Sequence, residues 1–141
     1  MNKYLYTLGQ ILKEDYPDRD ISSDDKISDL INGHIDEMLW VLTILKMELI
    51  YGVNIPDQLA DKTELTLEEF TDELSQLQLI PDKIYPEFYD IKIETIRLSK
   101  ELIDIEYQVV KKSDAEVNKI HQQFELLDDR LKILLGNVRA N

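Results

Sequence analysis

Apolar residues recur at α-helical spacing along most of this chain, and one stretch is apolar on every side. Residues 38–50 include only three polar side chains, those of Thr43, Lys46 and Glu48. A helix with apolar side chains all round is usually buried. We therefore expect a helix over residues 35–51 to lie at the centre of a bundle, with the other elements packed around it.

A clear end follows this central helix. Gly52 suits the left-handed conformation just past a helix C-terminus, and Pro56 can open the next helix. Residues 56–63 are then long enough for a short helix only.

Three further segments complete the first half. The apolar spacing over residues 4–15 predicts an amphipathic helix. Residues 16–34 are rich in Asp, Ser and turn formers, which predicts a long anchored loop with a short helical turn at 28–31. Thr66 and Glu69 form a capping box that opens a last helix. The buried stripe of that helix consists of Leu67, Phe70, Leu74 and Leu77.

Residues 81–141 predict a second module of one or two long helices, because no Pro or Gly occurs between Pro86 and Gly136. Apolar residues recur there every seven positions, as in a coiled coil. This seam consists of Ile96, Ile103, Val110, Val117, Phe124 and Leu131, with Ile120, Leu127 and Leu134 in complementary positions.

The number of tail helices stays open at this point. Ser113 and Glu116 form a capping box just after Lys111 and Lys112, which favours a break near Ser113 and an antiparallel pair. A single helix of about 50 residues would extend roughly 75 Å and would need a partner chain. That alternative predicts a homodimer through the C-terminal helices.

Most of the net negative charge lies in residues 1–80, and residues 81–141 are nearly balanced. The net charge is −13; residues 1–80 hold 6 basic and 17 acidic side chains, whereas residues 81–141 hold 10 and 12. An acidic surface repels nucleic acid and anionic membranes, so we expect neither as a partner. A protein with a basic surface is the expected partner.

Composition narrows the functional classes. The chain has no cysteine, which excludes disulfides and thiolate zinc sites. The first twenty residues lack the features of a signal peptide, and the longest apolar run is far shorter than a membrane span. We therefore expect a cytoplasmic protein. His34 and the acidic residues after it match no standard metal-ligand spacing, so no metal site is predicted.

The order of these elements resembles an acyl carrier protein over residues 1 to about 79. Residues 49–57, LIYGVNIPD, resemble the family's EEFGIEIPD run, and residues 61–70 resemble its entry to the last helix. Residues 27–30, ISDL, are similar to its DLG segment. The resemblance implies an all-α fold, an acyl-carrier-like four-helix bundle, followed here by the one or two long C-terminal helices.

The family's attachment site is altered in this chain. Acyl carrier proteins bear 4′-phosphopantetheine on the serine of an Asp-Ser-Leu motif, and counting back from Ile-Pro-Asp places Glu37 at that serine, between Asp36 and Met38. A carboxylate cannot receive the arm as a phosphodiester, so the resemblance implies no cofactor here. Acidic residues in a first helical turn also stabilise a helix, by roughly 0.3–1 kcal/mol each.

The family's acidic docking helix is altered too. The equivalent positions of the central helix are Leu39, Leu42 and Leu49, and only Glu48 keeps a charge. A row of exposed leucines would be a docking surface or an aggregation hazard. We expect the first tail helix to cover this face.

Three interpretations follow. The first is a non-enzymatic interaction or scaffold module without catalytic residues. The second is a genuine carrier that uses Ser28 as an atypical attachment residue. The third is an unrelated helical bundle whose Ile-Pro-Asp match is coincidental. In the first interpretation the residues expected to bind partners are Asp36, Glu37, Glu48, Ile120, Phe124, Leu127 and Leu131.

Overall fold

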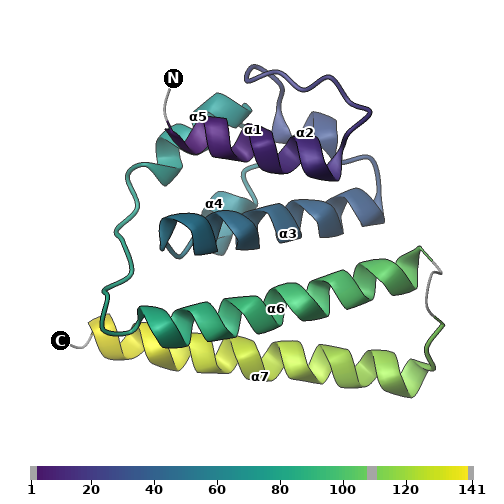
Figure 1. The fold of residues 1–141 in the computed structure, drawn as a ribbon, viewed down its shortest axis with the longest axis vertical. Coiled ribbons are helices and arrows are strands. Elements are labelled where there is room, and N and C mark those ends of the chain that lie inside the picture. The colour runs from purple at the N-terminus through teal and green to yellow at the C-terminus, as the bar shows by residue number, and fades with distance from the viewer. Residues whose placement is uncertain (1–2, 108–110, 140–141) are drawn as a thin grey trace. The chain divides into compact units, whose positions relative to one another are not determined.

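The chain forms two compact units of helices and loops. The computed structural model describes residues 3–107 and 111–139. Unit 1 spans Met1–Leu79 and unit 2 spans Ile80–Asn141. Figure 1 shows a group of short and medium helices in unit 1 and two long helices in unit 2. The predicted all-α class, with long helices at the C-terminal end of a helical bundle, is confirmed.

Unit 1 is built on a pair of antiparallel helices, which lie side by side in Figure 1. At one end the rings of Tyr4 and Tyr51 lie 4.3 Å apart between centroids. At the other end the Asp15 carboxylate accepts a hydrogen bond from Lys46 Nζ at 3.3 Å. The pair consists of α1 (Lys3–Asp15) and α3 (His34–Tyr51).

The core of unit 1 fills the space between this pair and a third helix, α5 (Leu67–Leu74). Trp40 of α3 and Phe70 of α5 meet edge to face, with ring centroids 5.3 Å apart. Other fully buried members of this core come from α1, α3 and α5. They include Leu8, Leu12, Met47 and Leu74.

The predicted helix ends of unit 1 are present. Gly52 has φ 62° and ψ 42°, the left-handed conformation, and its N–H donates to the Glu48 carbonyl at 2.9 Å. Thr66 Oγ1 accepts from the Glu69 N–H at 3.1 Å, and the Glu69 carboxylate accepts from the Thr66 N–H at 3.0 Å. The two short helices expected in the loops are α2 (Ile27–Leu30) and α4 (Asp57–Ala60).

Unit 2 is an antiparallel hairpin of α6 (Tyr85–Glu106) and α7 (Asp114–Arg139). The predicted break near Ser113 is confirmed: Ser113 Oγ accepts from the Glu116 N–H at 3.3 Å and α7 begins at the next residue. Val110 of the predicted seam lies outside the described residues. The core between the helices contains Ile80, Phe88, Ile91, Leu98, Ile120, Leu127 and Leu134.

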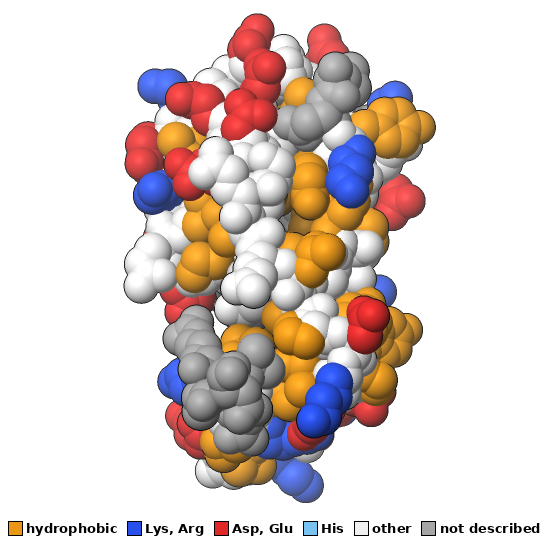
Figure 2. All heavy atoms as spheres, turned by 90° about the vertical axis from the view of Figure 1, so that its left-hand side faces the viewer, with side chains coloured by type: hydrophobic (Ala, Val, Ile, Leu, Met, Phe, Trp, Pro, Cys, Tyr) orange, Lys and Arg blue, Asp and Glu red, His pale blue; other side chains and the backbone are white. Residues whose placement is uncertain are grey.

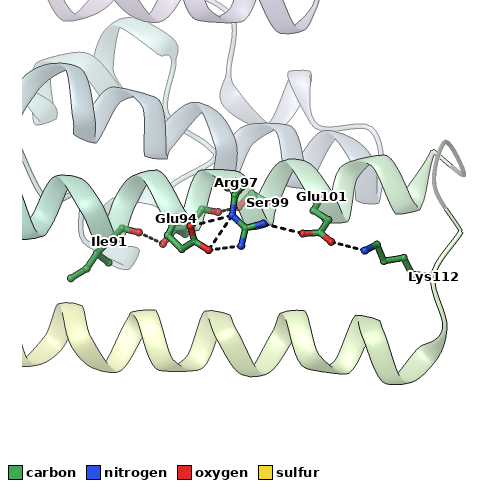
Figure 3. A network of polar contacts seen from close by, with 7 residues as sticks. Ile91, Glu94, Arg97, Ser99, Glu101 and Lys112 are labelled. Carbon is green, nitrogen blue, oxygen red and sulfur yellow. Dashed lines mark hydrogen bonds and ion pairs between the residues drawn. The ribbon is translucent and has the colours of Figure 1, made fainter.

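A polar network connects the two helices of the hairpin (Figure 3). Lys112, just before α7, binds Glu101 of α6 at 3.0 Å and Glu116 of α7 at 3.8 Å. Arg97 pairs with Glu94 and with Glu101. The hydrogen bond from Arg97 lowers the pKa of the Glu94 carboxyl, and the hydrogen bond to Glu101 raises the pKa of Lys112. Ion pairs between such exposed side chains contribute little to stability.

We expected the first tail helix to cover a face of α3 formed by Leu39, Leu42 and Leu49, and one of these residues needs a correction. Leu39 packs against the core of unit 1, so it belongs to the inward side of the helix. The expected cover for Leu42 and Leu49 depends on how the two units are arranged, and it stays a prediction.

Replacing Phe70 by alanine should lower the free energy of unfolding by about 3–5 kcal/mol, because the change leaves a cavity beside Trp40. Chemical denaturation followed by the fluorescence of Trp40 measures the loss. Tyr6→Ala is the matched control, since Tyr6 is 61% exposed, and it should change stability by less than about 0.5 kcal/mol. Equal losses in the two variants would contradict the assigned core.

The capping box predicts a pH dependence. Hydrogen bonds from the backbone and side chain of Thr66 lower the pKa of Glu69 below 4.5. A lowered pKa stabilises the fold fully above the unfolded value and ceases to do so as the pH falls through the folded value. Glu69→Gln should therefore lose less stability than wild type between pH 6 and pH 3, measured by denaturation at each pH.

Glu68→Gln is the control for this measurement, because Glu68 lies in the same first turn but outside the capping box. It should leave the acid dependence close to that of wild type. A larger effect of Glu68→Gln would contradict the assignment of the shift to the cap.

Candidate functional site

The first turn of α3 borders a surface cleft in unit 1. The volume of the cleft is about 390 Å³, and its walls come from α2, α3 and the segment after α4. Its lining combines apolar side chains with hydroxyls and carboxylates. The lining residues are Ser28, Ile31, Glu37, Trp40, Val41, Ala60, Asp61 and Thr63.

Backbone hydrogen bonds hold the walls of the cleft together. The Ser28 N–H donates to the Thr63 carbonyl at 2.8 Å, and the Ile27 N–H donates to the Leu65 carbonyl at 3.0 Å. On the other wall, Trp40 Nε1–H donates to the Ala60 carbonyl at 3.3 Å. These hydrogen bonds attach α2 to the segment after α4, and they attach the end of α4 to α3. The cleft between α2 and α4 is therefore preformed.

Two predicted site residues lie together in this cleft. Glu37, which the resemblance to acyl carrier proteins aligns with the attachment serine, is exposed on α3, and Ser28, the atypical attachment candidate, is exposed on α2. Nine positions separate them in sequence, but the anchored loop brings α2 back against the start of α3. Their spacing in the sequence does not by itself show that they share a cleft.

Asp36 joins the preceding loop to the same end of α3. Its Oδ2 accepts the Asn32 N–H at 2.9 Å and pairs with Arg19 Nη2 at 3.4 Å. Arg19 also donates from Nη1 to the Leu30 carbonyl at 2.8 Å, and its guanidinium lies 5.0 Å from the Tyr16 ring centroid. Arg19 thus joins both ends of the loop to α3, a role that sequence reasoning missed.

Glu48 is directed inward. It is 2% exposed, and its Oε2 accepts the Ile55 N–H at 2.9 Å, across the turn that follows α3. The hydrogen bond shows a structural role in holding the Gly52–Ile55 turn. A role in partner binding was predicted from its charge, and nothing in the structure tests that role.

The four predicted partner-binding residues of the tail lie in the hairpin. Ile120 and Leu127 are buried in the core of unit 2, and Phe124 and Leu131 pack against that core. Ile120 and Leu127 are out of reach of a partner while the hairpin is closed, whereas Phe124 and Leu131 are partly exposed. The seven-residue pattern identified the correct face of α7, but the structure turns this face towards α6.

The remaining candidates for chemistry give little. No group of three or more His, Asp or Glu side chains in the described part of the chain could hold a metal ion. The side chain of His34 is not among those described. Within residues 3–107 and 111–139, no helix is both long and apolar enough to span a membrane.

Comparisons with known proteins add no relative: no family model, curated protein or solved structure matches this chain.

The ion pair of Arg19 with Asp36, which holds the loop against α3, should give a measurable coupling energy. In a double-mutant cycle, Arg19→Met and Asp36→Asn should show a coupling of about 1 kcal/mol, because the two side chains are only 33% and 19% exposed. Lys62→Met and Glu73→Gln form the control cycle; that pair is 3.9 Å apart and nearly half exposed, so its coupling should be close to zero. Denaturation of all six variants gives both values, and equal couplings would contradict the clamp.

Proposed function

We propose that this chain is a non-enzymatic protein-interaction module that does not bear a phosphopantetheine arm. The observation that supports this most directly is the carboxylate of Glu37, exposed on the first turn of α3 at the edge of the cleft. A carboxylate offers no hydroxyl for a phosphodiester, so the position that the resemblance assigns to attachment has no acceptor. Its negative charge instead suits contact with a cationic group.

The charge of unit 1 supports a basic protein as the partner. Its 17 acidic side chains outnumber 6 basic ones, and three of the basic ones, Arg19, Lys46 and Lys62, already form ion pairs within the unit. Figure 2 shows several acidic side chains gathered on one face of this unit. Such a surface accelerates encounter with basic proteins and disfavours acidic ones.

A carrier function is the second candidate, because Ser28 and Glu37 line the same cleft. An arm attached to Ser28 would start beside the first turn of α3, which is where the resemblance implies that it should start. The first proposal also includes a cytoplasmic location. A homodimer through the C-terminal helices was expected from a single long helix, and the hairpin of α6 and α7 does not require it.

One experiment separates the two candidates. The purified chain is incubated with coenzyme A and a phosphopantetheinyl transferase of broad specificity, and its mass is then measured. We expect no change in mass, because Glu37 provides no hydroxyl acceptor. A gain of the mass of the arm would overturn the first proposal, and its loss in Ser28→Ala would identify the acceptor.

The matched variant is Glu37→Ser, with an acyl carrier protein as the positive control. Glu37→Ser should gain the arm, because it restores an acceptor at the position that the resemblance assigns. If the control is modified and Glu37→Ser is not, the resemblance to carrier proteins is wrong.

A further inference from the structure

Helix α7 carries the most exposed large apolar side chains of the described residues. These are Leu126, which is 65% exposed, and Ile133, which is 66% exposed. They lie seven positions apart, so they fall on the same side of the helix, about two turns from each other. The residue after each of them, Leu127 or Leu134, is buried in the core against α6. The hairpin therefore uses one side of α7 and leaves Leu126 and Ile133, the outer row, in water.

Polar side chains border the outer row on both sides. Asp129 lies three positions and Arg130 four positions after Leu126, and on a helix these two spacings place them on opposite sides of the row. Both side chains are exposed, and neither forms an ion pair with another described residue. Seven positions earlier, Gln122 and Gln123 occupy the same two places. One border is therefore Gln122 and Asp129, and the other is Gln123 and Arg130.

These borders are complementary to a second copy of α7 in one orientation only. When two copies face each other in parallel about a twofold axis, opposite borders meet. Asp129 of each copy then faces Arg130 of the other, and the amides of Gln122 and Gln123 can bond to each other. In an antiparallel pair each border meets the same border of the other copy, so Arg130 would face Arg130. Repulsion between such like charges disfavours the antiparallel pair.

The distribution of charge favours self-association through unit 2. Residues 1–80 hold 17 acidic and 6 basic side chains, so the first units of two copies repel each other. Residues 81–141 hold 12 acidic and 10 basic side chains, so two hairpins meet with little repulsion. A strongly basic partner would be repelled by Arg130, and a strongly acidic one by Asp129. A copy of the same helix satisfies both borders.

We propose that the outer row of α7 associates with the outer row of a second copy of this chain, with the two helices parallel. This contact is distinct from the seven-residue seam, which faces α6 within the hairpin. It concerns unit 2 and does not depend on the function proposed for unit 1. Two apolar layers bury far less than the about 1,200 Å² of a stable interface, so the dimer is weak and exchanges with the monomer.

Sedimentation equilibrium of the full chain, from about 10 μM to about 1 mM, tests the association. We expect the mean mass to rise reversibly towards that of two chains. Leu126→Ala with Ile133→Ala should weaken the dimer by about tenfold or more, because both apolar layers are lost. Tyr6→Ala with Ile50→Ala removes side chains that are 61% and 56% exposed on unit 1, and should change it by less than about twofold. Circular dichroism of both variants checks that the helices are intact.

Charge reversal tests the crossed pairs. In a homodimer, Asp129→Arg places cations against each other and Arg130→Asp places anions against each other, so each variant alone should associate several-fold more weakly. A mixture of the two variants restores opposite charges and should associate about as tightly as wild type. Association that ignores both substitutions would mean that the outer row aggregates without specificity, and would overturn the proposal.

A single introduced cysteine tests the orientation, since the natural chain has none. Lys119 lies seven positions before Leu126, on the same side of α7. In Lys119→Cys the two thiols meet in a parallel dimer, and oxidation by copper–phenanthroline should link the copies through a disulfide. In an antiparallel dimer the thiols would lie about 30 Å apart and would not react. Lys100→Cys, at an exposed position of α6, is the control and should give little linked dimer.

Three further results would overturn the proposal. A mass of one chain at every concentration up to about 1 mM would mean that no dimer forms. Equal weakening by the two double alanine variants would mean that the contact does not use the outer row. A dimer that Lys119→Cys does not link, or that Lys100→Cys links equally well, would contradict the parallel contact through α7.

Discussion

The burial of α3 is the constraint on which the rest of unit 1 depends. A helix with apolar side chains in every direction is insoluble as a free element, so the chain must supply neighbours for it. Helices α1 and α5 supply them on one side, and the edge-to-face contact of Trp40 with Phe70 lies at the centre of that packing. The same contact fixes the start of α3, where the cleft lies.

The cleft follows from how the long loop is anchored. Arg19 joins the loop to the start of α3, while hydrogen bonds from Ile27 and Ser28 attach α2 to the segment after α4. These contacts satisfy backbone groups that would otherwise be buried without partners. They also bring an acidic helix end, a serine and an aromatic wall together, so one set of structural contacts also assembles the candidate binding surface.

The hairpin of unit 2 shows how one apolar pattern supports two different assemblies. A seven-residue repeat is satisfied equally by a partner chain or by a neighbouring helix of the same chain. The capping box at Ser113 and the contacts of Lys112 with Glu101 and Glu116 favour reversal of the chain. An intramolecular helix is also always at high effective concentration, so the repeat is satisfied within the hairpin.

The sequence by itself determined most of the helices and their ends, because these depend on local chemistry: apolar spacing, Gly52 past α3, and the capping boxes at Thr66 and Ser113. It also placed Glu37 at the start of α3. Only the tertiary structure showed that Ser28 shares a cleft with Glu37, that Arg19 clamps the loop and that Glu48 faces inward. These facts depend on contacts between residues distant in sequence, and such contacts leave no local pattern to identify.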